Sequence, residues 1–246
     1  MVSAVAEQTR ATPRSEVVAD RDPEEAAAPK IDLLLRTDGC PICAGVSDGT
    51  FDFLAHWQYL LATDEAAQQS HRAAGGYCRE HTWALYAPAS SRGISAAYPL
   101  IADRYAQEVT NVTGLPARVM AERLREVTPS AATCRLCAFQ RQREEAAVRG
   151  LVTLLETKSG RAEYGATHGL CLPHLAAVLA LGVQDETAAL LVDAAARHLS
   201  DVSAAMRGYV LKLDARRRDL LTREEDNASH HALALLVGGR SRVPAS

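Results

Sequence analysis

The chain has 246 residues, a formal net charge of −3, 48% hydrophobic residues and 5% aromatic residues. That hydrophobic share is enough to build a core. The scarcity of aromatic residues, with recurrent Ala, Leu, Arg and Glu, favours helices over strands. We therefore predict an all-α fold. The charge excludes an overall positive field that would attract nucleic acid or an anionic membrane.

Residues 1–30 mix Ala, Glu, Pro, Ser and Arg without a sustained apolar period, which predicts a flexible leader. This segment lacks the basic-then-apolar pattern of a secretion signal. The chain also lacks the roughly 18 consecutive apolar residues that a membrane helix needs. We expect a cytoplasmic protein with no membrane partner. In a reducing compartment, paired cysteines indicate metal or redox chemistry rather than disulfides.

Two kinds of short motif occur in the same order in each half of the chain. A Cys-x-x-Cys pair recurs after 94 residues and a Cys-x-x-His pair after 93 residues, and a near-constant period is typical of an internal repeat. We predict two tandem helical modules, residues 31–127 and 128–222, followed by a tail with a short helix, residues 223–246. The motif residues are Cys40, Cys43, Cys78 and His81 in the first module and Cys134, Cys137, Cys171 and His174 in the second.

Between the two motifs of the first module, apolar residues recur every three or four positions from Phe51 to Leu61, which predicts a helix with one apolar face. Asp64 resembles the N-cap of a second helix, from about residue 65 to 74. We expect this helix to run back and return the chain to the start of the module. A glycine, Gly76 or Gly169, precedes each Cys-x-x-His pair, which is typical of a tight turn.

A further helix is expected after each Cys-x-x-His pair. Apolar residues from Leu191 to Leu213 are spaced by three and four, which predicts a long amphipathic helix. Its counterpart covers about residues 94 to 109, with Pro99 near its start, where a helix tolerates proline best. Basic residues gather between positions 207 and 223. We interpret them as a solvated helix face, so nucleic acid is not an expected partner.

Three thiolates and one imidazole form a ligand set that suits zinc. The two sets use all six cysteines of the chain, and each set is complete at four ligands, as in a structural rather than a hydrolytic site. We therefore expect two zinc ions, each bound within one module by a Cys3His site that joins helix ends. One or two [4Fe-4S] clusters are an alternative. Metal-free thiol–disulfide exchange is disfavoured, because its Cys-x-x-Cys motif accompanies a βαβ pattern.

The remaining histidines do not extend this pattern. His71 and His168 lie at different distances from the Cys-x-x-His pair that follows each of them, so they are not equivalent repeat positions. We interpret both as ordinary surface residues or as neighbours of the ligands. Glu80 of the first Cys-x-x-His pair is replaced by Pro173 in the second, which argues against a shared catalytic carboxylate.

From about residue 36 to 240, this ordered set of motifs resembles an uncharacterised bacterial family of duplicated Cys-x-x-Cys/Cys-x-x-His proteins, a domain of unknown function. The glycines before the Cys-x-x-His pairs and the ending Ala232-Leu233-Ala234-Leu235-Leu236-Val237-Gly238 carry the resemblance further. The resemblance implies a helical fold with two metal-ligand sets and no particular activity. Family members often have a tryptophan shortly before the final apolar helix, where this chain has Ser229-His230-His231.

The sequence contains no nucleotide-binding glycine loop, no serine-nucleophile motif and no convergent carboxylate cluster, so any enzyme chemistry would have to come from the metal sites. The leading hypothesis is a metal-binding protein that acts as a protein-interaction or regulatory module for a protein partner. The alternative is an iron–sulfur protein with a redox, sensing or cluster-dependent enzymatic role.

Overall fold

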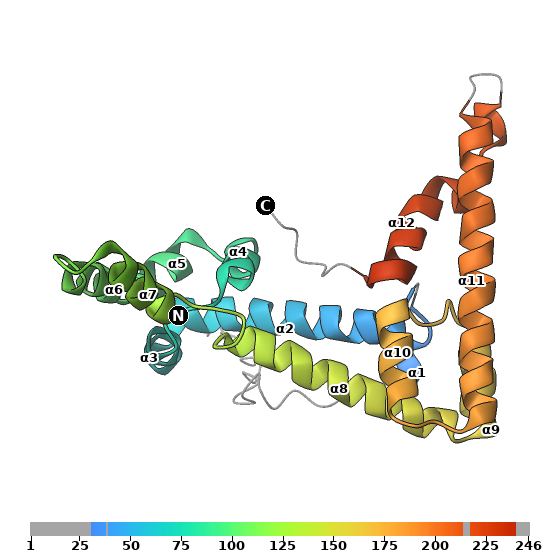
Figure 1. Ribbon diagram of the computed structural model, residues 1–246, viewed down its shortest axis with the longest axis horizontal. Helices are drawn as coiled ribbons and strands as arrows, with labels where there is room; N and C mark the ends of the chain where they lie inside the picture. The colour runs from blue at the N-terminus through green and yellow to red at the C-terminus, as the bar shows by residue number, and fades with distance from the viewer. Residues whose placement is uncertain (1–30, 38, 214–216, 240–246) are drawn as a thin grey trace, which may run out of the picture.

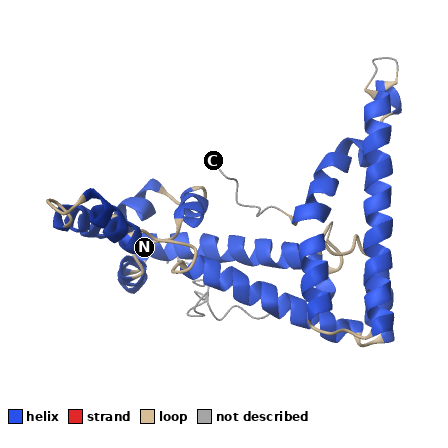
Figure 2. Cartoon of the chain, viewed as in Figure 1, coloured by secondary structure: helices blue, strands red, loops and turns tan. Residues whose placement is uncertain are grey.

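The computed structural model describes residues 31–37, 39–213 and 217–239. Within these residues all regular secondary structure is helical and there is no strand, which confirms the all-α prediction (Figure 2). The predicted leader, residues 1–30, and the end of the predicted tail, residues 240–246, lie outside the described residues.

The first Cys-x-x-Cys pair begins a helix that is longer than the sequence pattern predicted. A short helix, α1 (Ile31–Leu34), precedes α2 (Pro41–Thr63), which starts directly after Cys40 with a proline in its first turn. At 1.5 Å per residue, α2 is about 34 Å long. Asp64 is the predicted N-cap of α3 (Glu65–Ala73), and its side chain accepts a hydrogen bond of 2.7 Å from the backbone N–H of Ala67.

The predicted helix over residues 94 to 109 is divided in two. The first part, α5, ends at Ala97, and α6 begins at Pro99, whose ring nitrogen has no hydrogen to donate to the preceding turn. The helices that follow α3 in the first half are α4 (Arg79–Tyr86), α5 (Ser91–Ala97), α6 (Pro99–Asn111) and α7 (Ala117–Val127).

In the second half, the predicted long helix is present as α11, and the predicted tail helix as α12. Thr222 and Glu225 form a capping box at the start of α12, and Glu225 also accepts hydrogen bonds of 2.8 Å from the Lys212 ammonium at the end of α11. The elements are α8 (Arg135–Leu155), α9 (Lys158–Gly165), α10 (Leu172–Ala180), α11 (Asp185–Lys212), a 3-10 turn (Arg218–Leu220) and α12 (Arg223–Val237).

Figure 1 shows how the two halves are combined. Helices α2 and α8 lie side by side and antiparallel, and they pack extensively on each other. Helices α10, α11 and α12 gather where α2 begins, whereas α3 to α7 gather toward its far end. Where α2 and α8 cross, the Arg143 side chain lies over Gly49, in space that any larger residue at position 49 would fill.

Two hydrophobic cores flank this pair of helices, and each contains side chains from both predicted modules. Around the start of α2, Ile42 packs in one core with Leu151 and Val178. Farther along α2, Trp57 packs in the other core with Phe139. Neither core belongs to one half of the chain alone.

One residue of the predicted apolar face of α2 is not buried. Phe51 is 49% exposed, whereas its neighbour Thr50 is 1% exposed. The reason is that α8 covers the side of α2 that carries Thr50, where the Gln140 amide donates a hydrogen bond of 3.0 Å to the Thr50 hydroxyl. A polar pair therefore occupies the contact between the two long helices.

Candidate metal centres

Each of the four ligand pairs lies at the N-terminal end of a helix. The first cysteine of each pair is the N-cap residue, with extended backbone angles, and the second ligand follows in the first turn. A helix N-terminus carries partial positive charge, which favours a nearby thiolate. The N-cap cysteines are Cys40 of α2, Cys78 of α4, Cys134 of α8 and Cys171 of α10.

The predicted glycine turns before the Cys-x-x-His pairs are present. Gly76 has φ 85° and Gly169 has φ 75°, in the region that residues with a side chain rarely adopt. These turns direct the chain into α4 and α10 so that Cys78 and Cys171 begin those helices.

The first cluster, called centre 1 here, lies where α2 and α10 begin. The Nδ1 atom of His174 is 3.3 Å from Sγ of Cys40, 3.3 Å from Sγ of Cys43 and 3.1 Å from Sγ of Cys171. The sulfur atoms of Cys43 and Cys171 are 3.8 Å apart. All four donor atoms lie within 4.8 Å of one another, and Cys43 is the one residue of the four that is not fully buried.

The second cluster, centre 2, lies where α4 and α8 begin. The Nδ1 atom of His81 is 3.4 Å from Sγ of Cys78, 3.5 Å from Sγ of Cys134 and 3.3 Å from Sγ of Cys137. The sulfur atoms of Cys78 and Cys137 are 3.7 Å apart. Here too the four donor atoms lie within 4.8 Å of one another.

The eight predicted residues therefore converge in two sets of four, but the predicted pairing is wrong. Each centre combines the Cys-x-x-Cys pair of one half with the Cys-x-x-His pair of the other half. Helix lengths explain the exchange. Helix α3, with 9 residues, runs only about 14 Å, so it cannot return the chain along the roughly 34 Å of α2. The sites thus link residues 31–127 to residues 128–222 and do not lie within either segment.

The donor spacing fits a single tetrahedral ion in each centre. With zinc–sulfur bonds near 2.3 Å and zinc–nitrogen bonds near 2.0 Å, tetrahedral angles give distances of about 3.8 Å between sulfur atoms and about 3.5 Å from sulfur to nitrogen. One sulfur pair in each centre, at 3.8 Å in centre 1 and 3.7 Å in centre 2, agrees closely with this expectation, and the other donor pairs lie within 4.8 Å. The sulfur–nitrogen distances, 3.1 to 3.5 Å, equal the expected sulfur–nitrogen distance or are slightly shorter.

In centre 1 the thiolate form of Cys40 is favoured, whereas that of its neighbour Cys171 is disfavoured. Hydrogen bonds from Cys171 and Cys43 lower the pKa of Cys40, and the same hydrogen bond to Cys40 raises the pKa of Cys171. Burial lowers the pKa of His174, but hydrogen bonds to Cys40 and Cys43 outweigh burial and raise it to about 10.

Centre 2 shows the same opposition between neighbouring thiols. Burial raises the pKa of Cys134, but hydrogen bonds from His81 and other neighbours outweigh burial and lower it to about 6. Burial and the negative charge of Cys134 raise the pKa of Cys137 to about 12. Three thiolates this close repel one another, and a divalent cation would offset that repulsion.

Centre 1 has two further contacts that the motif spacing does not predict. The Glu144 carboxylate lies 3.0 Å from Nε2 of His174, so it fixes the orientation of the ring whose other nitrogen faces the sulfur atoms. After α12, Gly238 has φ 91°, and the backbone N–H of Gly239 donates a hydrogen bond of 3.3 Å to Sγ of Cys43. The Gly-Gly pair that follows the final apolar run was the one sequence signal for this close approach.

Centre 2 has a different environment. Within the described part of the chain, the hydrogen bonds of the His81 ring go to sulfur atoms only. In the register of the repeat, Thr50 stands where the second half has Glu144, and its hydroxyl hydrogen-bonds the Val46 carbonyl oxygen. Aromatic side chains pack around this centre, among them Trp57 and Tyr77. The two centres share a ligand set but differ in what surrounds it.

His71 and His168, which belong to neither ligand set, lie in different environments. His71 is 1% exposed and packs among Trp57, Tyr77 and Tyr98, so its interpretation as a surface residue is wrong. Burial, with a smaller contribution from the charge of Arg135, lowers the pKa of His71 to about 4. His168 is exposed, as expected, and lines a cavity beside centre 1.

Among the described helices, none combines the length and the apolar character that a membrane-spanning segment requires. Comparison with protein-family models, with curated proteins and with solved structures finds no match for this chain.

Proposed function

We propose that the protein binds two zinc ions, one in each centre, and that these ions join the N-terminal and C-terminal halves of the chain. The single observation that carries the proposal is the spacing of the four donor atoms, which suits one tetrahedral ion in each centre. Cys40, Cys43, Cys171 and His174 would hold one ion, and Cys78, His81, Cys134 and Cys137 the other. With four protein ligands each, both ions have a structural role.

The same spacing disfavours a [4Fe-4S] cluster. The ligands of such a cluster bind four different iron atoms, so they lie farther apart than ligands that share one ion. In both centres every donor atom lies within 4.8 Å of the other three. Accommodating a cluster would require the N-terminal ends of α2 and α10, or of α4 and α8, to separate.

We further propose that this zinc-joined helical framework is a cytoplasmic interaction module for a protein partner. The support is exposed apolar surface on two projecting parts of the fold. The α6–α7 hairpin exposes Val109 and Val119, and the far end of α11 exposes Val210 and Leu211. Exposed apolar surface of this kind is typical of protein-binding sites.

Metal and acid-labile sulfide determination after anaerobic purification tests the metal proposal. We expect two zinc ions per chain, no sulfide and no visible absorbance. Iron and sulfide in stoichiometric amounts, with a brown colour, would contradict it. The His81→Cys variant adds a second test, because a four-thiolate site holds zinc equally well and, among the described residues, the hydrogen bonds of the His81 ring go only to sulfur atoms. This variant should keep two zinc ions and its melting temperature, and loss of one ion would contradict a purely structural role for centre 2.

A further inference from the structure

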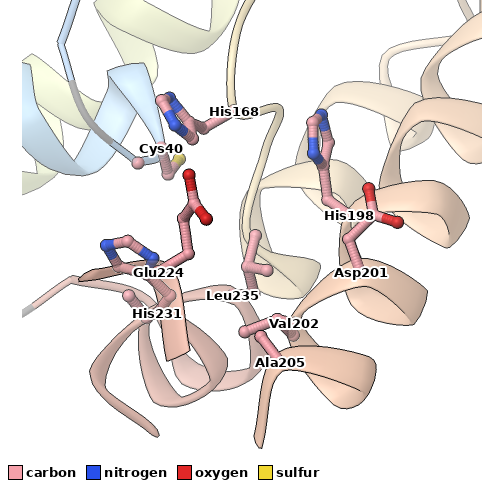
Figure 3. Close-up of a pocket in the computed structure, with 11 residues that line it drawn as sticks. Cys40, His168, His198, Asp201, Val202, Ala205, Glu224, His231 and Leu235 are labelled. Atoms are coloured by element: carbon pink, nitrogen blue, oxygen red, sulfur yellow. The ribbon is translucent and has the colours of Figure 1, made fainter. Parts of the chain in front are cut away.

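A cavity of about 230 Å³ lies beside centre 1, between α11, α12 and the segment that precedes Cys171 (Figure 3). Cys40 lines it from the side of the metal centre. Its polar lining comes from three separate segments of the chain, with one histidine in each. These polar residues are His168, His198, Asp201, Glu224 and His231.

The polar residues are distributed around an apolar base. In Figure 3, Glu224 and His168 lie on the side of Cys40, and His198 and Asp201 lie on the opposite side, on α11. Between them the lining is made by small and aliphatic side chains of α11 and α12, including Val202, Ala205, Ala234 and Leu235. An apolar cavity with a few convergent polar groups is the usual form of a small-molecule site.

The side chains of Asp201 and Glu224 are exposed, and within the described residues neither carboxylate has a hydrogen-bond or ion-pair partner. The adjacent Glu225 differs, because it binds both Lys212 and Thr222. None of the described residues that line the cavity is a lysine or an arginine. Two negative charges at the edge of an apolar surface, with no cationic side chain in the described lining, favour a positively charged ligand and disfavour an anion.

A bare metal ion does not fit this arrangement as it stands. Within the described residues, the Cys, His, Asp and Glu donor atoms that converge closely enough to hold an ion are those of centres 1 and 2. Asp201 and Glu224 therefore form no such donor group with the histidines of the cavity. A ligand that contacts both walls has to extend across the apolar base, which requires an organic molecule.

We propose that this cavity binds a small aliphatic ammonium compound, with amino groups at Glu224 and Asp201 and its carbon chain on the apolar base. The three histidines supply further hydrogen-bonding groups around it. This inference goes beyond the proposed zinc binding and rests on it only in so far as centre 1 holds Gly39 and Cys40 at the cavity wall.

Calorimetric titration of the full-length, metal-loaded chain tests the proposal with three probes of the same length: 1,5-diaminopentane, pentane-1,5-diol and glutarate. We expect the diamine to bind, the diol to bind at least about tenfold more weakly and glutarate not to bind. Glu224→Gln should weaken the diamine about tenfold or more, because a charged hydrogen bond is lost. The control Asp226→Asn removes an exposed carboxylate from the same helical turn and should leave the affinity unchanged.

Equal binding of diamine and diol, binding of glutarate, or failure of the diamine to bind would overturn the proposal. So would unchanged diamine affinity in a folded Glu224→Gln variant. If Glu224→Gln does not fold, Asp201→Asn replaces it, with Asp193→Asn of the same helix as its control. Zinc content measured in the same samples separates the two proposals: a chain without zinc that still binds the diamine contradicts only the zinc sites, and a zinc-loaded chain that does not bind it contradicts only the cavity.

Discussion

The Sγ atom of Cys40 lies 3.3 Å from Nδ1 of His174, although 134 residues separate the two along the chain. In centre 2, His81 of the first half meets Cys134 and Cys137 of the second half in the same way. Two substitutions can therefore damage one centre or both, and the outcome depends only on which cysteines are combined.

The double variant Cys43→Ser, Cys171→Ser changes two ligands of centre 1, so it should lose one zinc ion and retain the other with normal affinity. The matched double variant Cys43→Ser, Cys78→Ser changes one ligand in each centre and should weaken both ions. Competition with a chromogenic chelator measures the number of tightly held ions in each variant. The opposite pattern would show that each half of the chain forms its own site.

Glu144→Gln should weaken zinc binding at centre 1 alone, by about tenfold to a hundredfold, because the carboxylate that orients His174 is lost. The second ion, at centre 2, should be unaffected. The measurement is zinc transfer to a chelator, in which the variant should show one fast and one normal phase. Glu145→Gln is the control, because Glu145 is exposed and pairs with Arg149 rather than with a ligand. Equal effects of the two substitutions would exclude a specific role for Glu144.

Burial of His71 makes the stability of the fold depend on pH. Its pKa is about 4 in the folded chain, against 6.5 for the unperturbed side chain. As pH falls below 6.5, this histidine binds a proton in the unfolded chain but stays neutral in the folded chain. The free energy of unfolding therefore falls, by up to about 3 kcal/mol near pH 4. Above pH 6.5 both states hold the neutral ring, and this contribution is fully present.

The variant His71→Leu cannot titrate at this position. Its stability relative to the wild type should therefore improve by about 1.3 kcal/mol between pH 7.5 and pH 5.5, whatever the constant effect of repacking. Urea unfolding of both proteins at the two pH values measures this difference. Any acid-induced loss of metal is common to both and cancels. Parallel pH profiles would mean that His71 is not buried in its neutral form.

Gly160→Ala should destabilise the protein by about 2 kcal/mol, because the added Cβ would meet the backbone oxygen of Leu154 at the junction of α8 and α9. Gly165, in the last turn of α9, has no heavy atom within 4 Å of an added Cβ. Gly165→Ala should therefore be neutral, or more stable by up to about 1 kcal/mol. Urea unfolding midpoints of the two variants, compared with the wild type, measure this difference.

The sequence was sufficient to predict the helical class and the residue types that converge, because Cys-x-x-Cys and Cys-x-x-His spacing places two donors in one helical turn. It was not sufficient to predict which pairs meet. Pairing within a half and pairing between halves use identical motifs, and only the lengths of α2 and α3 distinguish them. The apolar spacing that predicted α2 began at Phe51 and so underestimated that length.

The contact of Glu144 with His174 could not be predicted for a related reason. Glu144 lies among charged residues of α8, in a stretch that resembles any solvated helix face. Its role depends on the packing of α10 beside α8, which places His174 next to it. Long-range contacts of this kind are set by how the helices cross and leave no periodic signal in the sequence.

The exchanged pairing also makes the two centres topologically nested. Cys78 and Cys137 close a loop of 59 residues that lies wholly inside the span of 134 residues between Cys40 and His174. The longer closure costs only about 0.7 kcal/mol more in chain entropy, so at equilibrium the two loops are nearly equivalent. They are not equivalent during synthesis, when the N-terminus emerges first. The last donor of centre 2 leaves the ribosome before His174 does, so the inner centre can close while the outer one still lacks its second pair.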